Sequence, residues 1–392
     1  MSDGKIICKL CEGHTHSIEL HLKEFHKDET IASYKEKFPN EPILSVMATQ
    51  KLAEHWAAKS AAMSKTMMAT SALAIVAPEV TQKDFHTLFG FGEEKAALSS
   101  SGKPIKVTIV SAAKDADLVP LVDEEYIFDI APLKNILMGI ELNIPTYVWG
   151  HAGVGKTSLY EQIAARTKRP FLRVQHTINT EEAHILGQWT VKGGETVYQL
   201  GPLPMAMLNG WVYCADEYDF ALPSVLSVYQ AVLEGKPLVI KDAPPEFRII
   251  SPSANFRIVA TGNTNGGGDE TGLYQGTQIQ NSANYERFGI VEQIRYMTEE
   301  QEVKIIVSRA KIAASDAAKL VQFAKSVRDS YEKASISSTI SPRSLIFAAK
   351  LGIRRGSFRI GINLAFTNRL NKVDREVIDA VAQRLFGVGG AV

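Results

Sequence analysis

Short apolar runs, each followed by polar residues, recur through the middle of the chain. The run at 145–149 precedes a glycine-rich segment, the run at 211–215 precedes two acidic residues, and the run at 256–260 precedes Thr-Gly-Asn. Apolar runs of this length predict buried strands. The pattern therefore predicts an α/β core in which functional groups follow the ends of buried strands.

The first apolar run leads into a phosphate-binding loop. Residues 150–157 read Gly-His-Ala-Gly-Val-Gly-Lys-Thr, which is G-x-x-x-x-G-K-T, and a helix is expected over 158–166. The glycines let the backbone fold around an anion, Lys156 supplies a charge for the β- and γ-phosphates, and Thr157 is placed for Mg²⁺. The helix directs its positive end at the nucleotide. The candidate ATP-binding residues are Gly150, His151, Ala152, Gly153, Val154, Gly155, Lys156, Thr157 and Ser158.

The second run ends in Asp216 and Glu217. Taken alone, it could be a buried strand that ends in two solvated acids. Beside a phosphate-binding loop, we expect Asp216 to hold Mg²⁺ together with Thr157, and so to belong to the ATP site. Glu217 is then expected to orient and deprotonate the attacking water, because phosphoryl transfer needs positioning and charge stabilisation.

The third run is followed by Asn263, whose amide can hold the lytic water, as in the sensor position of the AAA+ class. Two arginines come later, Arg287 in Glu-Arg-Phe and Arg343 in Ser-Pro-Arg at an expected helix start. Either arginine alone would be assigned to the surface. In this order, Arg287 is interpreted as a finger offered to a neighbouring subunit's nucleotide and Arg343 as the lid arginine. The candidate catalytic residues are Glu217, Asn263, Arg287 and Arg343.

Several strings resemble the ATPase subunit of aerobic cobaltochelatase, the CobS type within the MoxR group of AAA+ proteins. They are Tyr-Ile-Phe-Asp at 126–129, the phosphate-binding loop, Asp-Glu-Tyr-Asp at 216–219, Ala-Thr-Gly-Asn-Thr at 260–264 and Gly-Leu-Tyr-Gln-Gly-Thr-Gln at 272–278. The resemblance implies a ring-forming motor, usually a hexamer. It also implies a partner with a von Willebrand-type metal-binding domain, with which the motor drives a metal into a tetrapyrrole. The client itself is not implied, because relatives on this scaffold activate other metalloenzymes.

The resemblance also points to the helix-2-insert clade of AAA+ proteins, which carries two inserted hairpins. Residues 188–190 and 196–199, joined through Gly-Gly, predict the first hairpin, and residues 239–241 and 248–250 predict the second. In a ring such hairpins face the pore or the partner. Trp189 is the candidate contact residue, with a core or interface role as the alternative.

The N-terminus carries a possible zinc site, Cys8, Cys11, His21 and His26, in the order C-x2-C-x9-H-x4-H. Two thiolates and two imidazoles suit tetrahedral Zn²⁺, and the short gap resembles the compact bacterial Ros-type finger. Ile18, Leu22 and Phe25 follow at i, i+4 and i+7, which predicts one apolar stripe beneath the metal. His14 and His16 are spare ligand candidates, and His16 could replace the first helix ligand. A disordered tail with chance Cys and His residues is the alternative.

Composition narrows the class of protein. The 392 residues include 43 Lys plus Arg and 43 Asp plus Glu, so net charge gives no indication of a nucleic-acid or membrane surface. Three cysteines make no disulfide framework. No apolar run reaches the ~18 residues of a membrane span, and no basic segment followed by an apolar one stands at the N-terminus. We expect a cytoplasmic protein.

Four segments are expected. Residues 1–45 form the zinc finger, 46–120 a helical linker and connector, 121–298 the AAA+ α/β ATPase core, and 299–392 a helical lid. The linker is rich in good helix formers, and its Met63, Met67 and Met68 suit packing better than a metal site. A strand is expected over 106–110.

Two functions of different classes fit these features. The favoured one is an ATP-hydrolysing ring motor that drives metal insertion or metalloenzyme remodelling with a von Willebrand-type partner. The rival is a remodeller tethered to nucleic acid by its finger, although the finger's lysines are matched by acidic residues. A scaffold that binds nucleotide without turnover is disfavoured because Lys156, Glu217 and Arg287 are all present.

Overall fold

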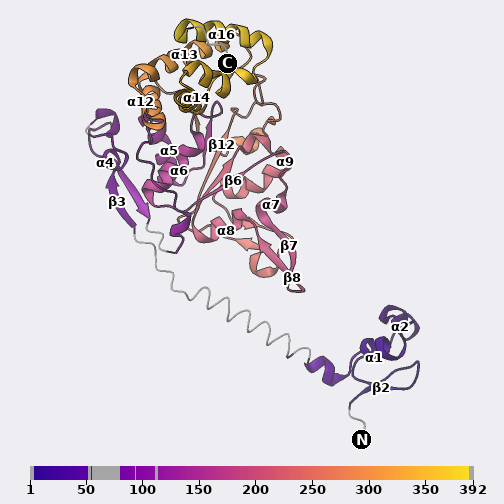
Figure 1. Cartoon of the computed structure of the whole chain (residues 1–392). Helices are drawn as coiled ribbons and strands as arrows, with labels where there is room; N and C mark the ends of the chain where they lie inside the picture. The colour runs from indigo at the N-terminus through magenta and orange to yellow at the C-terminus, as the bar shows by residue number, and fades with distance from the viewer. Residues whose placement is uncertain (1–3, 52–53, 55–79, 93, 111–113, 388–392) are drawn as a thin grey trace. The chain divides into compact units, whose positions relative to one another are not determined.

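The computed structural model describes residues 4–51, 54, 80–92, 94–110 and 114–387 (Figure 1). The chain divides into two compact units, Met1–Ala77 and Pro78–Val392. Residues 46–51 are helical, but most of the helix expected in the linker, including Met63, Met67 and Met68, lies outside the described residues.

The first unit is a small ββα domain followed by a second helix. Strand β1 (Ile6–Ile7) pairs antiparallel with β2 (His14–Thr15), and α1 (Ile18–Phe25) and α2 (Ile31–Lys37) follow. Their shared core is Cys8, Ile18, Leu22 and Tyr34. The expected stripe is therefore wrong at Phe25, which is 63% exposed. This residue ends α1, where its ring packs on that of His21, and Tyr34 from α2 joins the core instead.

A five-stranded parallel sheet forms the centre of the second unit. Its order is β13 (Ile290–Gln293), β5 (Thr146–Trp149), β12 (Arg257–Gly262), β9 (Val212–Asp216) and β6 (Phe171–Gln175). Because alternate residues of a strand face opposite sides, two cores result. Helices α5 (Ile130–Leu142) and α6 (Lys156–Thr167) cover one face, and α7 (Glu182–Leu186), α8 (Pro202–Asn209), α9 (Pro223–Leu226) and α10 (Gln230–Leu233) cover the other.

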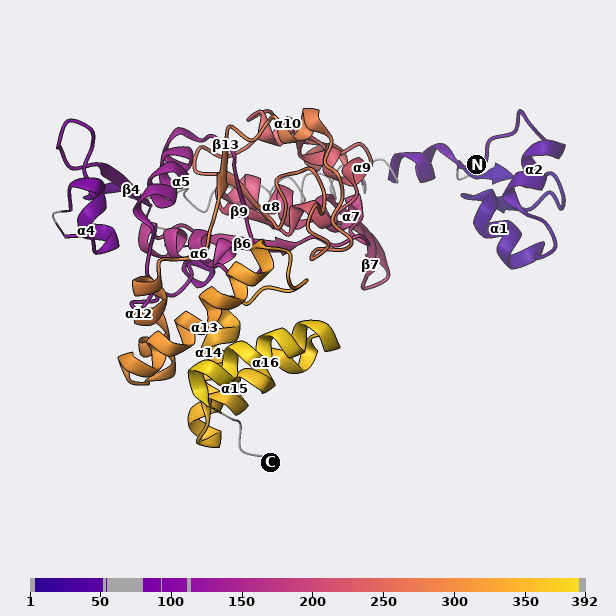
Figure 2. The ribbon, with the colours of Figure 1, turned by 90° about the horizontal axis from the view of Figure 1, so that it is seen from above.

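Five α-helices follow the sheet in the described part of the chain and form its C-terminal part, called the lid here. Thr298 and Gln301 form a capping box that starts α12 (Glu299–Ala310). The other lid helices are α13 (Ala314–Glu332), α14 (Pro342–Arg355), α15 (Phe358–Ala365) and α16 (Lys372–Phe386). They enclose a core of their own, and Figure 2 shows them as a layer beside the sheet domain. A buried Arg328–Glu302 ion pair with two 2.8 Å hydrogen bonds joins α13 to α12.

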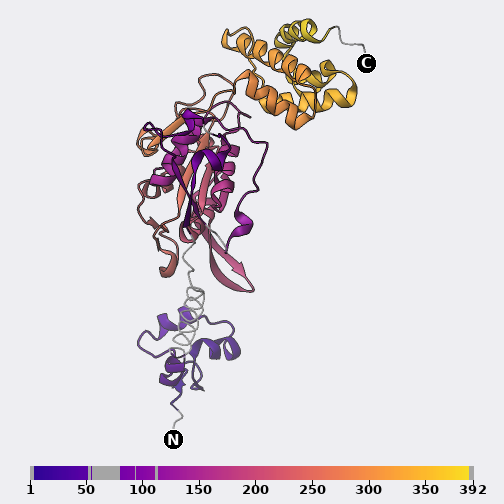
Figure 3. The ribbon, with the colours of Figure 1, turned by 90° about the vertical axis from the view of Figure 1, so that its left-hand side faces the viewer.

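Both inserted hairpins are present. Strand β7 (Gly187–Lys192) pairs with β8 (Glu195–Leu200), and β10 (Leu238–Val239) pairs with β11 (Ile249–Ile250). The first hairpin lies at the end of the second unit away from the lid (Figure 1; Figure 3). Trp189 is 47% exposed, and its indole N–H donates to the carbonyl of Asp242, 2.9 Å away, next to the second hairpin.

Residues 80–92 and 94–110 pack with the ATPase core, whereas the sequence analysis placed them in the linker. Strand β3 (Val80–Asp84) pairs with β4 (Lys106–Val110), the strand expected over 106–110. Helix α4 (Phe85–Phe89) then joins the core that α5 and α6 share. The second compact unit therefore begins near Pro78, because buried aromatic side chains far upstream of the loop complete one face of the sheet.

Short 3₁₀ helices and one further α-helix connect these elements. They are η1 (Lys95–Ala97), η2 (Ala116–Leu118), η3 (Tyr218–Phe220), η4 (Ser227–Tyr229), η5 (Pro245–Phe247), α11 (Ser282–Tyr285) and η6 (Thr367–Arg369). Among the described residues, none of the helices combines the length and the apolar character needed to cross a membrane.

Candidate active site

The phosphate-binding loop joins the end of β5 to α6, which begins at Lys156, two residues before the expected start. Gly150 has φ 150°, and a Cβ atom there would lie 2.2 Å from the carbonyl oxygen of Ile294. Gly153 has φ 79°, and a Cβ atom there would lie 2.8 Å from that of Ser341 in the lid. Both positions therefore require glycine, and the loop is enclosed between β13 and the lid.

Lys156 is held among oxygen atoms. Its ammonium donates to the carbonyls of Gly150 (2.8 Å) and His151 (3.0 Å) and to Oδ1 of Asn263 (2.9 Å). Burial lowers the pKa of Lys156 to about 8, while Asp219, Asp216 and Glu217 act in the opposite direction. The side chain is thus mostly charged at neutral pH, as phosphate binding requires.

Asp216 is 2% exposed and joins three strands of the sheet to the loop. Its Oδ1 accepts hydrogen bonds from the hydroxyls of Thr157 and Thr261, both 2.6 Å away. Its Oδ2 accepts from Nε of Arg173 on β6 at 2.7 Å. The two residues expected to hold Mg²⁺, Thr157 and Asp216, are therefore in direct contact, and they present hard oxygen atoms of the kind that Mg²⁺ prefers.

Glu217 follows β9 in a left-handed backbone conformation, with φ 53°. Such a conformation costs about 1–3 kcal/mol for a residue other than glycine and is found at functional sites. The backbone N–H of Glu217 donates to the hydroxyl of Thr261 (3.1 Å), and its carboxylate accepts from the amide of Gln175 at 2.6 Å. The acid is thus held by β12 and β6, next to the end of β9.

Asp219, to which the sequence analysis gave no role, connects the acidic strand to the sensor strand. Its Oδ2 accepts from the N–H groups of Asn263 and Thr264, both at 2.8 Å, and from the Thr264 hydroxyl at 2.9 Å. The residue is fully buried, and burial raises its pKa against the opposing hydrogen bonds from Thr264 and Asn263. Asp219 therefore fixes the backbone that presents the Asn263 amide to Lys156.

The two candidate arginines lie in different places. Arg343 lies at the start of the lid helix α14. A Cβ atom added to Gly153 would lie 3.6 Å from the Cβ of Arg343, so Arg343 is next to the phosphate-binding loop. Arg287 instead pairs with Glu234 at 2.7 Å and donates to the carbonyl of Ala283. The structure thus brings Lys156, Thr157, Asp216, Glu217, Asn263 and Arg343 to one edge of the sheet and leaves Arg287 in a separate group.

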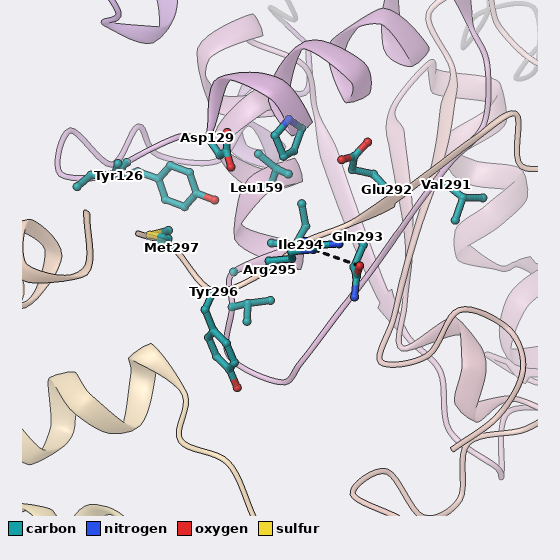
Figure 4. A pocket seen from close by; sticks show the side chains of 14 residues that line it. Tyr126, Asp129, Leu159, Val291, Glu292, Gln293, Ile294, Arg295, Tyr296 and Met297 are labelled. Atoms are coloured by element: carbon teal, nitrogen blue, oxygen red, sulfur yellow. Dashed lines mark hydrogen bonds between the residues drawn. The ribbon is translucent and has the colours of Figure 1, made fainter. Parts of the chain in front are cut away.

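A cavity of about 360 Å³ adjoins the loop (Figure 4). It lies between Tyr126, the loop residues Val154 and Gly155, and the chain that leaves β13 at Ile294 to Tyr296. Its volume is in the range of small-molecule sites. A second hollow, of about 530 Å³, is bordered by His151, Asn263 and Tyr274. The Lys156 ammonium donates to the backbone of His151 and to Asn263, so this hollow borders the phosphate-binding end of the loop.

Four site residues were missed from the sequence: Arg173, Gln175, Asp219 and Thr261. The first two occupy alternate positions of β6, so they face the same side of the sheet. Polar residues at alternate positions of an otherwise apolar strand were the available indication. Thr261 stood in the recognised string but was given no role, although it contacts both Asp216 and Glu217.

In the first unit, the four candidate zinc ligands form one cluster. The ligand atoms of Cys8, Cys11, His21 and His26 lie within 4.8 Å of one another, and Sγ of Cys11 is 3.1 Å from Nε2 of His21. Nε2 of His26 is buried without a hydrogen-bond partner among the described residues. His16 is engaged elsewhere, through a 2.9 Å hydrogen bond between its Nδ1 and the hydroxyl of Ser45.

The chain is similar in sequence to known proteins. The "Aerobic cobaltochelatase subunit CobS" of Sinorhizobium sp is 33% identical over 280 residues, which cover 69% of this chain and 83% of that protein. The chain belongs to the CobS family of AAA+ ATPases. Residues 145–278 match the family described as AAA domain (dynein-related subfamily), and residues 302–383 match CbbQ/NirQ/NorQ C-terminal.

A second relative of this CobS-family chain is "Protein NorQ" of Paracoccus denitrificans (strain Pd 1222). It is 26% identical over 238 residues, which cover 61% of this chain and 81% of that protein. The solved structure of the Thermotoga maritima RuvB Holliday junction branch migration motor covers 68% of this chain and 73% of that chain, with 16% identity and a TM-score of 0.40. Family membership makes this chain an ATPase with a P-loop α/β core and a helical C-terminal region.

Proposed function

We propose that this CobS-family ATPase uses the residues at the sheet edge for ATP hydrolysis. The loop from Gly150 to Ser158 holds the phosphates, and Lys156 neutralises charge on the β- and γ-phosphates. Thr157 and Asp216 hold Mg²⁺, which supplies charge stabilisation, and Glu217 deprotonates the attacking water. The observation that carries this assignment is that the loop is hydrogen-bonded to the ends of two neighbouring strands: Lys156 donates to Asn263, and Thr157 donates to Asp216.

We further propose that the ATPase works as a homo-oligomeric ring, a hexamer, and drives metal insertion or metalloenzyme remodelling with a von Willebrand-type partner. The similarity to CobS over most of that protein supports this function, and the similarity to NorQ supports the wider class. The exposed hairpins support it too, because Val191 and Val239 present apolar side chains at their surface.

A trap experiment tests this function. Glu217→Gln rings are expected to keep ATP and so to retain the partner or client in a pulldown, whereas wild-type rings release it on hydrolysis. A captured protein with a von Willebrand-type domain, or a metalloenzyme, is the expected result. Capture of nucleic acid alone would favour the tethered remodeller instead.

The first unit is expected to dock the partner and to be dispensable for hydrolysis, because it is a separate compact unit. Deleting residues 1–45 should leave basal ATPase activity within about twofold of wild type. The same deletion in the Glu217→Gln background should weaken capture in the pulldown. A deletion that abolished ATP hydrolysis would contradict this division of labour.

We also propose that Cys8, Cys11, His21 and His26 bind one structural Zn²⁺. The donor set fits, because two thiolates and two imidazoles complete a tetrahedral site, and the buried Nε2 of His26 otherwise lacks a partner among the described residues. Four buried side chains make a core too small to hold such a unit together, so the metal would supply folding free energy.

Elemental analysis of the purified chain is expected to give one zinc per chain. Changing both Cys8 and Cys11 to Ser should abolish the zinc, because two of four ligands are lost, and should unfold the first unit. The matched control is Cys214→Ala, which removes a buried thiol of β9 and should leave the zinc in place. A zinc-free wild-type chain with both N-terminal thiols reactive would contradict the site.

Three lysines in the described part of the first unit are paired with acidic side chains. Lys9 pairs with Glu41, Lys23 with Glu19, and Lys37 with Glu29. Binding to phosphate backbones depends on unpaired positive charge. We therefore prefer a protein-docking role for this unit to a nucleic-acid tether.

A further inference from the structure

The segment 264–278, which we call the glycine-rich loop, is hydrogen-bonded to Asp219 at both of its ends. At its start, the N–H and the hydroxyl of Thr264 donate to Oδ2 of Asp219. At its end, the N–H of Gln278 donates to the backbone carbonyl of Asp219 at 2.7 Å. Within the loop, Oδ2 of Asp269 accepts from the N–H of Tyr274 at 2.7 Å. These bonds give the loop a defined conformation with Tyr274 in a fixed place.

The Tyr274 hydroxyl contacts the phosphate-binding loop at two atoms. It lies 3.1 Å from the backbone nitrogen of Ala152 and 2.8 Å from Nδ1 of His151. The N–H of Ala152 can only donate, so the hydroxyl accepts there and keeps its own hydrogen for a second bond. Burial lowers the pKa of His151 and so favours the neutral imidazole, which can accept that hydrogen at Nδ1 in the tautomer protonated at Nε2.

The peptide bond between His151 and Ala152 connects this hydroxyl to Lys156. Its carbonyl accepts from the Lys156 ammonium at 3.0 Å, and its N–H donates to Tyr274. In a planar trans peptide the C=O and the N–H point in opposite directions. A hydroxyl fixed on one side of this peptide therefore sets the direction of the carbonyl on the other side.

The same imidazole is contacted from another direction by Tyr296, between β13 and the lid, and by Tyr331 of the lid helix α13, whose ring centre is 6.0 Å away. The His151 ring stacks on Tyr296 at 5.5 Å and 11°, and the guanidinium of Arg328 lies 3.7 Å from the centre of the Tyr296 ring. Arg328 is in turn fixed by its ion pair with Glu302. The Tyr274 hydroxyl thus meets the phosphate-binding loop at the residue that the lid also contacts.

We propose that Tyr274 is a positioning residue for ATP hydrolysis, whose hydroxyl orients the His151–Ala152 peptide so that its carbonyl holds Lys156 in place for the transferred phosphate. The inference rests on the role proposed above for Lys156. Tyr274 acts through the peptide and through Lys156, so its loss should affect the transition state more than the initial binding of ATP.

Tyr274→Phe keeps the ring and removes only the hydroxyl. The variant loses the hydrogen bonds to Ala152 and His151. The bond to the Ala152 N–H orients the peptide, and its loss corresponds to about tenfold, so kcat should fall about tenfold while KM for ATP changes less than about twofold. The matched control is Tyr285→Phe, because the Tyr285 hydroxyl is buried without a hydrogen-bond partner in the described part of the chain. This control should keep wild-type kcat and KM, and thermal melting should show both variants folded.

A Tyr274→Phe variant with wild-type kcat would overturn the inference. If that variant also bound ATP more tightly than wild type, the hydroxyl would instead be a group that ATP displaces on binding. Lys156→Ala measured alongside separates the inference from its premise. If Lys156→Ala loses nucleotide while Tyr274→Phe matches wild type, only the inference fails; if Lys156→Ala binds ATP normally, the role of Lys156 fails and the inference falls with it.

Discussion

Glu217→Gln should bind ATP with near wild-type affinity and hydrolyse it several hundredfold more slowly, or worse, whereas Lys156→Ala should lose nucleotide affinity. The structure gives the two side chains different surroundings. The Lys156 ammonium lies among loop carbonyls, where a phosphate would meet it, and the Glu217 carboxylate lies beside Gln175 at the end of β6. Removing a general base costs hydrolysis by factors of about 10²–10⁴ without removing a phosphate contact.

Nucleotide binding and phosphate release measured on the same preparations separate the two roles. Glu246→Gln makes the same chemical change at an exposed carboxylate near the second hairpin and should hydrolyse ATP like wild type. If wild type and Glu217→Gln released phosphate at equal rates, Glu217 could not be the base. If Lys156→Ala retained full affinity, the loop would not bind phosphate as proposed.

The grouping of the residues proposed for the ATP site was largely predictable because its parts are local in sequence. The phosphate-binding loop, Asp216, Glu217 and Asn263 each follow an apolar run, and the carboxyl ends of parallel strands meet at one edge of a sheet. Each part could therefore be found alone, and the fold brings them together. The cluster of Cys8, Cys11, His21 and His26 was predictable for the same reason, since the four residues lie in one short segment.

Contacts between distant segments were not predictable in this way. Arg173 belongs to a strand that follows the loop, yet its guanidinium pairs with Asp216 of the neighbouring strand. Phe85 lies far before the loop, in a segment with turn residues on both sides, and packs in the core of the sheet. In the sequence, Asp219 is one of three acidic residues that follow an apolar run. Its hydrogen bond to the N–H of Asn263 is evident only once β12 is placed beside β9. Such roles depend on strand order, which local patterns do not specify.

The position of Arg287 leads to a prediction about the proposed ring. Within the described part of the chain, its guanidinium pairs with Glu234 and donates to the Ala283 carbonyl, and it contacts none of Lys156, Asp216 and Glu217. Lys236 and Arg287 both hold the pKa of Glu234 below its usual value, so this carboxylate stays charged and keeps the arginine near the surface. Exposed ion pairs of this kind contribute little to stability. The γ-phosphate of ATP bound to a neighbouring subunit is therefore expected to compete with Glu234 for the Arg287 guanidinium.

Arg287→Ala should bind ATP and hydrolyse it at least a hundredfold more slowly than wild type, since arginine fingers contribute about 10³–10⁵ in rate. Mixing it with Glu217→Gln subunits should restore part of the activity, because some interfaces then pair an intact finger with an intact acid. Arg384→Ala, which removes an exposed arginine of α16, is the control and should stay active. Full activity of Arg287→Ala alone would exclude the finger, and so would a wild-type chain that hydrolyses ATP as a strict monomer, because a finger in trans requires a neighbour.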